Sequence, residues 1–287
     1  KNLIPAFQFL NAFWSDISHP DPYLVYVGAA PGNNLNVLIQ AFPWFNYHLY
    51  DIATFDERIS SLSNVTIHNK LFDTEDIEYW KEIQKTQKNV FMMFDIRNSK
   101  YRKDLTEDEK NEILHDDLIF QMKCVKEIFP VKSLLKIKFP SKINPDPEKS
   151  EDETHFSYLD GVAYRHTYTD KNSKDFSLVP HDNVSLRLWN IEVMDWAITH
   201  HNIIVRQNLY LSEFETPDKI FISQELGIKN NFDGIILTMT LRDYLLKFSP
   251  FTGLRYPTLD EIIACLKSII KNILPDHRNR LLPKSKK

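Results

Sequence analysis

Short apolar runs alternate along the first half of the chain with stretches in which apolar residues recur at helical spacing. Strands are predicted at residues 24–27, 47–50, 64–68, 91–94 and 134–139. Helices are predicted over residues 3–13 and 113–129, and another is predicted to begin at residue 35. Strands that alternate with helices are typical of a parallel sheet covered on both faces. The pattern therefore predicts an α/β fold with a doubly wound, mostly parallel sheet.

The second half of the chain has a less regular pattern. Residues 140–154 are polar and rich in proline, and we interpret residues 140–184 as a long loop region. Later apolar runs predict strands at residues 203–205, 219–222 and 234–237, and a helix over residues 259–273. We expect one domain over residues 1–275, with residues 1–20 as its N-terminal helix, followed by a basic, disordered tail over residues 276–287.

Composition narrows the class of protein. The net charge is −4, so any surface that binds nucleic acid must be local. Two cysteines, Cys124 and Cys265, cannot form a disulfide framework, and no spacing typical of a zinc site occurs. No run approaches the roughly 20 apolar residues of a membrane helix. We therefore expect a soluble protein of a reducing compartment, without a metal and without a membrane.

The most informative motif follows the first predicted strand, where Tyr26-Val27-Gly28-Ala29-Ala30-Pro31-Gly32 forms a glycine turn. Glycines permit a sharp turn and close approach of a ligand to the backbone. The dinucleotide fingerprint and the phosphate-loop motif are both missing, which disfavours a diphosphate ligand. A less anionic ligand such as S-adenosylmethionine fits better. Asp51 ends the second strand about 20 residues later, where an acid that binds ribose is expected. Asp51 alone could equally cap the next helix.

Two further residues suggest chemistry at strand ends. Asp95 follows the apolar run at residues 91–94, and Lys136 lies between apolar residues of a predicted strand. A lysine is costly to bury as a cation unless a carboxylate meets it, and partial burial favours its neutral, basic form. Beside Asp95 it could help to remove the proton of a sugar hydroxyl. From the pattern alone, a lysine at a sheet edge that points to solvent is the more common explanation.

These segments coincide with the motifs of a known family. They are residues 26–32, Tyr50-Asp51, residues 64–66, residues 94–97, Leu135-Lys136 with Pro140 following, and residues 186–188. The chain resembles the poxvirus-type cap-specific mRNA nucleoside 2′-O-methyltransferases within the wider FtsJ-like group, which also serve as the processivity subunit of the viral poly(A) polymerase. The resemblance is strongest over residues 23–140 and faint after about residue 190. It implies a Rossmann-like, S-adenosylmethionine-dependent methyltransferase fold.

The resemblance also implies site residues. It assigns Lys1, Asp95 and Lys136 as catalytic, with Lys136 acting on the ribose hydroxyl of the first transcribed nucleotide. The fourth catalytic position, a glutamate in the family, aligns with Ser185; Glu192 is the alternative, unless the alignment slips locally or activity is weakened. The cofactor positions fall on Tyr26, Gly28, Ala30, Pro31, Gly32, Asn34, Asp51, Phe72 and Asp95.

Recognition of the RNA departs from the family pattern. The aromatic residue that would stack on the methylated guanine is Ser141 here, and Ile143 replaces its acidic partner. Phe139 is the nearest aromatic residue. We expect RNA contacts at Arg97, Lys100, Lys138 and Phe139, because basic groups neutralise phosphates, although solvated surface charge is the simpler reading of each basic residue alone.

Three functions are consistent with these residues. The first is methylation of the ribose 2′-oxygen at the 5′ cap of mRNA for a large cytoplasmic DNA virus, in the host cytoplasm or the virion. The second is a non-catalytic RNA-binding module that assists a viral poly(A) polymerase catalytic subunit. The third is an FtsJ-like 2′-O-methyltransferase that acts on another RNA, such as ribosomal RNA. Capped mRNA and the polymerase are the expected partners.

Overall fold

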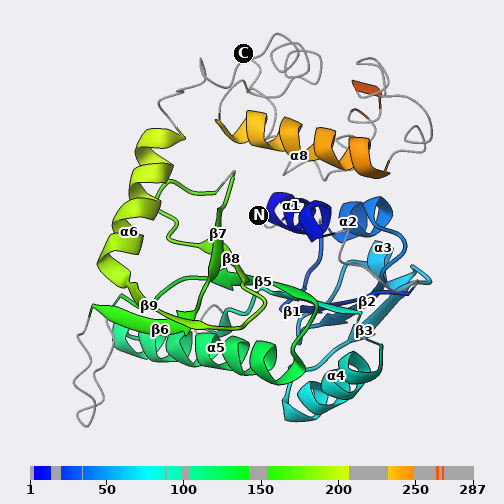
Figure 1. Ribbon diagram of the computed structural model, residues 1–287, viewed down its shortest axis with the longest axis horizontal. Coiled ribbons are helices and arrows are strands. Elements are labelled where there is room, and N and C mark those ends of the chain that lie inside the picture. The colour runs from blue at the N-terminus through cyan, green and yellow to red at the C-terminus, as the bar shows by residue number, and fades with distance from the viewer. Residues whose placement is uncertain are drawn as a thin grey trace.

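The protein is built around a seven-stranded sheet with helices on both faces and a small two-stranded sheet beside it (Figure 1). A computed structural model describes residues 3–13, 21–33, 35–87, 89–98, 104–141, 154–167, 169–206 and 232–248, with residues 263, 264 and 267. The strands of the large sheet are β1 (Tyr23–Val27), β2 (Asn46–Tyr50), β3 (Val65–His68), β4 (Val90–Phe94), β5 (Lys132–Ile137), β7 (Gly161–Arg165) and β8 (Phe176–Pro180). The small sheet pairs β6 (His155–Leu159) with β9 (Leu186–Asn190).

The strand order of the large sheet is β3-β2-β1-β4-β5-β8-β7. The first five strands of the chain pair in parallel, whereas β8 runs antiparallel to β5 and β7 antiparallel to β8. All five residues of β4 are buried, as expected for a central parallel strand covered on both faces. The α/β fold with a doubly wound, mostly parallel sheet is confirmed.

Helices divide between the two faces of the sheet. One face packs against α1 (Leu3–Phe13), α2 (Leu35–Ala41), α3 (Glu57–Ser60) and α8 (Phe232–Phe248). The other face packs against α4 (Thr74–Gln87), α5 (Glu107–Ile128) and the small sheet, with α6 (Ile191–His200) beside them. A π-helical segment, η3 (His201–Val205), continues α6. Two apolar cores result, one on each face of the sheet.

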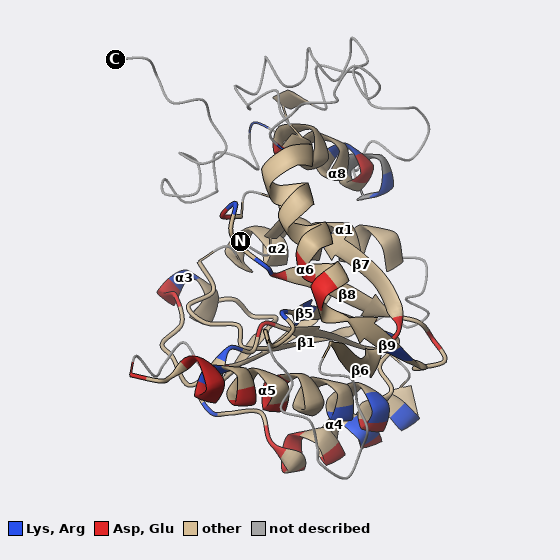
Figure 2. Ribbon diagram, turned by 90° about the vertical axis from the view of Figure 1, so that its left-hand side faces the viewer, with Lys and Arg blue, Asp and Glu red and all other residues tan. Residues whose placement is uncertain are grey.

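The longest helix, α5, has clear sequence signals at both ends. Thr106 caps its N-terminus in a capping box with Glu109, and acidic residues fill its first turn, where the helix dipole favours negative charge (Figure 2). Phe129 ends the helix in the left-handed conformation. The two caps set where α5 begins and ends.

No helix among the described residues is both long and apolar enough to cross a membrane.

The loop region predicted over residues 140–184 is wrong, because three strands, β6, β7 and β8, lie within it. Their apolar runs are short and set among polar turns, so periodicity alone did not separate them from loop. The strands predicted at residues 203–205 and 234–237 are also wrong, since these residues belong to η3 and α8. Short apolar runs do not distinguish a strand from the buried side of a helix. The run at residues 219–222, most of the helix at residues 259–273 and the tail lie outside the described residues.

Gly28 is predicted to be indispensable for the fold. Its φ is +79°, and a Cβ atom there would lie 2.6 Å from the carbonyl oxygen of Asp95. We expect Gly28→Ala to lower the free energy of unfolding by about 2–4 kcal/mol, because it combines backbone strain with a clash against the loop after β4. Urea unfolding followed by circular dichroism measures the change. The exposed Gln40→Ala in α2 is the control, with an expected change under about 0.5 kcal/mol; equal stability of the two variants would contradict the prediction.

Candidate functional site

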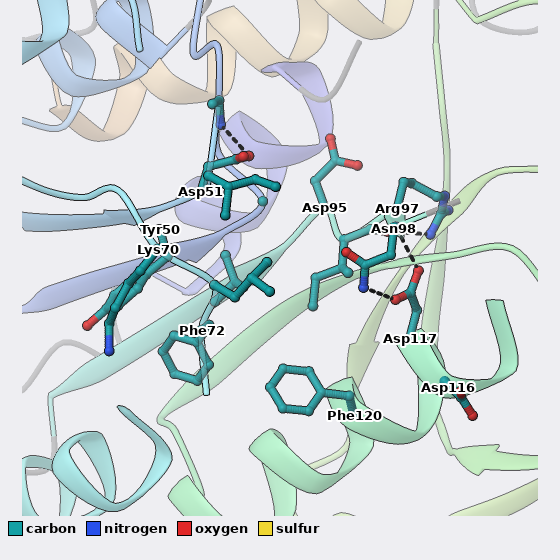
Figure 3. A pocket seen from close by; sticks show the side chains of 16 residues that line it. Tyr50, Asp51, Lys70, Phe72, Asp95, Arg97, Asn98, Asp116, Asp117 and Phe120 are labelled. Atoms are coloured by element: carbon teal, nitrogen blue, oxygen red, sulfur yellow. Dashed lines mark hydrogen bonds between the residues drawn. The ribbon is translucent and has the colours of Figure 1, made fainter. Parts of the chain in front are cut away.

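A cavity of about 310 Å³ opens at the carboxyl ends of the parallel strands. Loops after β1, β2, β3 and β4 form most of its wall, and α5 closes one side (Figure 3). Its lining comprises Val27, Gly28, Ala30, Tyr50, Asp51, Ile52, Lys70, Leu71, Phe72, Asp95, Ile96, Arg97, Asn98, Asp116, Asp117 and Phe120. Ligands of open α/β sheets bind outside the carboxyl ends of the strands. The cavity therefore occupies the position at which the fold places a ligand.

Asp51 holds the glycine turn together. One carboxylate oxygen accepts a hydrogen bond from the backbone amide of Ala30 at 3.0 Å, and the other accepts one from that of Ala53 at 2.9 Å. The interpretation of Asp51 as a helix cap is wrong, because Asp56 caps the next helix, α3. Asp51 is buried yet lines the cavity. Each carboxylate oxygen can accept further hydrogen bonds, so the side chain can hold the turn and still receive a ligand hydroxyl.

The predicted cofactor residues divide into two groups. Gly28, Ala30, Asp51, Phe72 and Asp95 line the cavity. The other residues lie elsewhere: Tyr26 is buried in the core beneath α1 and α2, Pro31 is exposed, Gly32 packs against Ile59, and Asn34 lies outside the described residues. The glycine turn therefore has a structural role as well. Because Gly28 lacks a Cβ atom, the backbone of Asp95 can pack directly against it.

Lys136 is the centre of a buried chain of charges. Its Nζ lies 2.5 Å from Oδ1 of Asp95 and 3.7 Å from Oδ2 of Asp175. The guanidinium of Arg97 lies 3.5 Å from the other oxygen of Asp175. The interpretation of Lys136 as a solvent-facing lysine at a sheet edge is wrong, because it is 6% exposed and β5 lies between β4 and β8. Two cations and two carboxylates alternate, which balances the charge.

The direction of the Lys136 side chain follows from strand alternation. Its neighbours Leu135 and Ile137 belong to the core beneath α4 and α5. Lys136 therefore points to the opposite face, which α1 and α8 cover. Ser177 of β8 is its partner in the strand register and faces the same way. The charged chain thus lies at the carboxyl end of β5, on the face covered by the N-terminal helix.

Asp175 belongs to this charged chain but was not predicted from the sequence. Burial alone would raise the pKa of this carboxyl, but the positive charges of Arg97 and Lys136 outweigh that effect and hold its pKa below the usual range. Asp175 directly precedes β8, inside the segment interpreted as loop. An antiparallel strand begins where its neighbour ends, so the start of β8 meets the end of β5. The acid before the apolar run at residues 176–180 was the available signal.

The two residues proposed for the fourth catalytic position lie elsewhere. Ser185 follows a turn whose Asp182 pairs with Lys132, the first residue of β5. Lys136 lies four positions further along the strand than Lys132, or roughly 13 Å away. Glu192 is exposed in the first turn of α6. The described acid in contact with Lys136 beyond Asp95 is Asp175.

His166 is a second residue near Lys136 that was not predicted from the sequence. Its Nε2 lies 2.7 Å from the hydroxyl oxygen of Ser177, and both side chains are buried. Burial is the main reason that the pKa of His166 is lowered to about 4. The negative charge of Asp175 raises this pKa and the positive charge of Lys136 lowers it, but each effect is smaller than that of burial. The imidazole is therefore uncharged at neutral pH. The pair adds no net charge beside Lys136.

The predicted RNA-binding residues differ in how exposed they are. Arg97 is buried and paired with Asp175, which does not favour contact with a phosphate. Phe139 is buried among aromatic rings, including Phe156 and Trp189, so stacking on a base is contradicted. Lys138 is partly exposed and stays a candidate, whereas Lys100 lies outside the described residues. Lys1, predicted to be catalytic, also lies outside them.

The described residues contain no cluster of three or more His, Cys, Asp or Glu side chains that could hold a metal.

Asp175→Asn should destabilise the protein in a pH-dependent way. The variant leaves Arg97 buried without its carboxylate, which we expect to cost about 2 kcal/mol at pH 7, less than for a fully buried pair because a quarter of the Asp175 side chain is exposed. The folded-state pKa of Asp175 is depressed. Its contribution is therefore complete above the usual aspartate pKa of about 4 and disappears as the pH falls through the lower, folded value.

Urea unfolding of the wild type and Asp175→Asn at several pH values between about 3 and 7 measures this difference. The exposed Asp108→Asn in α5 is the control, for which we expect little difference at any pH. A stability gap for Asp175→Asn that stays constant down to pH 3 would contradict the assignment.

Comparison with known proteins agrees with this architecture. Over 145 residues the chain is 27% identical to a Fowlpox virus (strain NVSL) protein named cap-specific mRNA (nucleoside-2′-O-)-methyltransferase. The match covers 49% of this chain and 46% of the relative, so the chain spans about half the length of that curated protein. The profile of a family described as poly A polymerase regulatory subunit matches residues 1–221. The chain belongs to this poxvirus-type family of poly(A) polymerase regulatory subunits.

Proposed function

We propose that the chain is an S-adenosylmethionine-dependent RNA methyltransferase that acts on the ribose 2′-oxygen at the 5′ cap of mRNA. The observation that carries the proposal is the position of Asp95. It lines the cavity and also contacts the Nζ of Lys136. The Asp95 carboxylate therefore lies between the cavity and the buried amine of Lys136. Methyl transfer requires such proximity between the donor in the cavity and the group that acts on the acceptor hydroxyl.

The charges around the cavity favour a cationic ligand. Four acids and two bases line it: Asp51, Asp95, Asp116 and Asp117 against Lys70 and Arg97. Such a lining suits a sulfonium compound and disfavours a diphosphate, in agreement with the missing phosphate-binding motifs. Asp51 would bind the ribose hydroxyls and the backbone at Gly28 and Ala30 the amino-acid end. When bound, the cofactor supplies a methyl group activated by positive sulfur.

The residues of the chain would orient and deprotonate the acceptor. Asp95 and Asp175 hold the Lys136 amine from two sides, which limits its rotation. As a neutral amine, Lys136 would accept the proton of the 2′-hydroxyl at Nζ, which would make the ribose oxygen a nucleophile towards the methyl group that a bound cofactor supplies.

Lys136→Ala should bind S-adenosylmethionine with an affinity similar to that of the wild type and transfer methyl groups at least about 100-fold more slowly, since it keeps the pocket and loses the base. Calorimetry measures binding, and a radioactive methyl-transfer assay on short capped RNA measures rate. The matched control is Lys132→Ala at the far end of the same strand, whose amine pairs with Asp182. Unchanged transfer by Lys136→Ala would refute the catalytic role of Lys136.

A non-catalytic role is the second candidate, and the regulatory-subunit description of the family favours it. In this case the chain would bind RNA and assist a poly(A) polymerase catalytic subunit, using the fold as a scaffold. Calorimetric titration with S-adenosylmethionine separates the two functions. Lack of measurable binding to the wild type would favour the scaffold, whereas a dissociation constant in the micromolar range would favour the enzyme.

The identity of the RNA is a separate question. Ser141 makes reciprocal hydrogen bonds with Asn111, and Phe139 is buried, so neither residue offers an exposed ring for a methylated guanine. The alternative substrate class is therefore uncapped RNA, which an FtsJ-like enzyme would methylate. We expect the wild type to methylate a capped transcript at least about tenfold faster than the same transcript without a cap. Equal rates would favour the alternative, and mapping the methyl group by nuclease digestion identifies the nucleotide.

A further inference from the structure

We propose that Asn98, locked in one orientation by Asp117, recognises the exocyclic amine of the adenine base in the methyl donor. This inference rests on the proposed function and adds a specificity-determining residue to it. Asn98 follows β4, Asp117 lies in α5, and both line the cavity at the side remote from Asp51 (Figure 3). Neither residue belongs to the catalytic or cofactor positions implied by the sequence.

Asp117 accepts hydrogen bonds from two donors of Asn98, its backbone amide and one N–H of its side-chain amide. One oxygen of its carboxylate accepts from the backbone amide of Asn98 at 3.1 Å, and the other accepts from the side-chain Nδ2 at 2.6 Å. Two donors facing two oxygens is the pattern of an ionised carboxylate, which can only accept. Asp117 is 3% exposed, and burial holds its pKa above the usual value, although the two hydrogen bonds from Asn98 and the charge of Arg97 limit that rise.

This pairing determines which atom Asn98 presents to the cavity. The amide nitrogen and oxygen of an asparagine are assigned from their partners, and here the nitrogen must face the carboxylate. The carbonyl oxygen therefore lies on the side away from Asp117, towards the cavity (Figure 3). Asn98 is exposed, but rotating its amide would place the side-chain oxygen against a carboxylate oxygen of the buried Asp117 and lose a hydrogen bond, which is costly. Asn98 is thus a fixed acceptor.

The remaining walls at this end suit a flat apolar ring. The rings of Phe72 and Phe120 lie 6.4 Å apart between centroids, at 73°. Ile52 and Leu71 also line the cavity and are 55% and 60% exposed, so they have apolar surface that a bound base would cover. A purine inserted here would bury its faces against these side chains. Its polar edge would then meet Asn98.

A fixed acceptor distinguishes purines by the group at position 6. Adenine has an amine there, which donates to the carbonyl oxygen of Asn98. Hypoxanthine and guanine have an oxygen, which would face that carbonyl with no proton between them. Sites built for one hydrogen bond reject analogues that leave their polar groups unpaired. We therefore expect a preference of about 100-fold for the adenine compound.

The experiment is calorimetric titration of the full chain with S-adenosylhomocysteine and with S-inosylhomocysteine, its 6-oxo analogue. The wild type should prefer the adenine compound by about 100-fold, and Asn98→Ala should reduce that ratio to within about threefold. Asp117→Asn should also reduce the ratio, because an amide partner permits both orientations of Asn98. The control is Asn111→Ala, which removes an asparagine of α5 whose contacts are with Ser141; its ratio should match the wild type.

The ratio of affinities is a readout that a merely structural role would not change, since loss of structure weakens both compounds together. A ratio near 100 retained in Asn98→Ala, or in Asp117→Asn should the first variant fail to fold, would overturn the inference. Equal binding of the two compounds by the wild type would overturn it as well and leave the proposed function standing. Binding of neither compound by the wild type would overturn both.

Discussion

The burial of the Lys136 amine between two carboxylates is the interaction on which the rest of the site depends. An isolated ammonium in that position would be too costly to keep charged, so the fold must bring acids to it from separate strands. Asp95 arrives from the parallel neighbour β4 and Asp175 from the antiparallel neighbour β8. Arg97 then balances the second acid. Charge balance explains why four ionisable residues converge at one end of β5.

The antiparallel strand β8 is as important as the parallel core. A purely parallel neighbour would begin at the opposite edge of the sheet and would leave the carboxyl end of β5 without an acid. Because β8 runs the other way, its first residues lie beside the last residues of β5. Ser177 and His166 then follow on the same face and add a neutral, hydrogen-bonded pair beside the charges. The pocket and the amine consequently meet at Asp95.

Most of the parallel half could be predicted from the sequence, because its signals are local. Strand runs such as residues 91–94, the glycine turn at Gly28 and the acids Asp51 and Asp95 at strand ends were all placed correctly. The errors share one cause. The strands after residue 154 are short and irregular, so β8 was missed and with it the contact of Asp175 with Lys136. Phe139 and Arg97 were expected at the surface, since a sequence shows residue type and not exposure.

The sequence by itself determined the α/β class, the turn after the first strand, the family and the pairing partners Asp95 and Lys136. These features depend on periodicity, on glycine conformation and on which residues end strands, all of which are properties of neighbouring residues. Only the tertiary structure decided that Asp175 meets Lys136 and that Asp117 orients Asn98. Each of these contacts joins segments brought together by sheet order or helix packing. Such contacts leave no periodic trace in the chain, because they depend on how elements pack and not on how residues alternate within them.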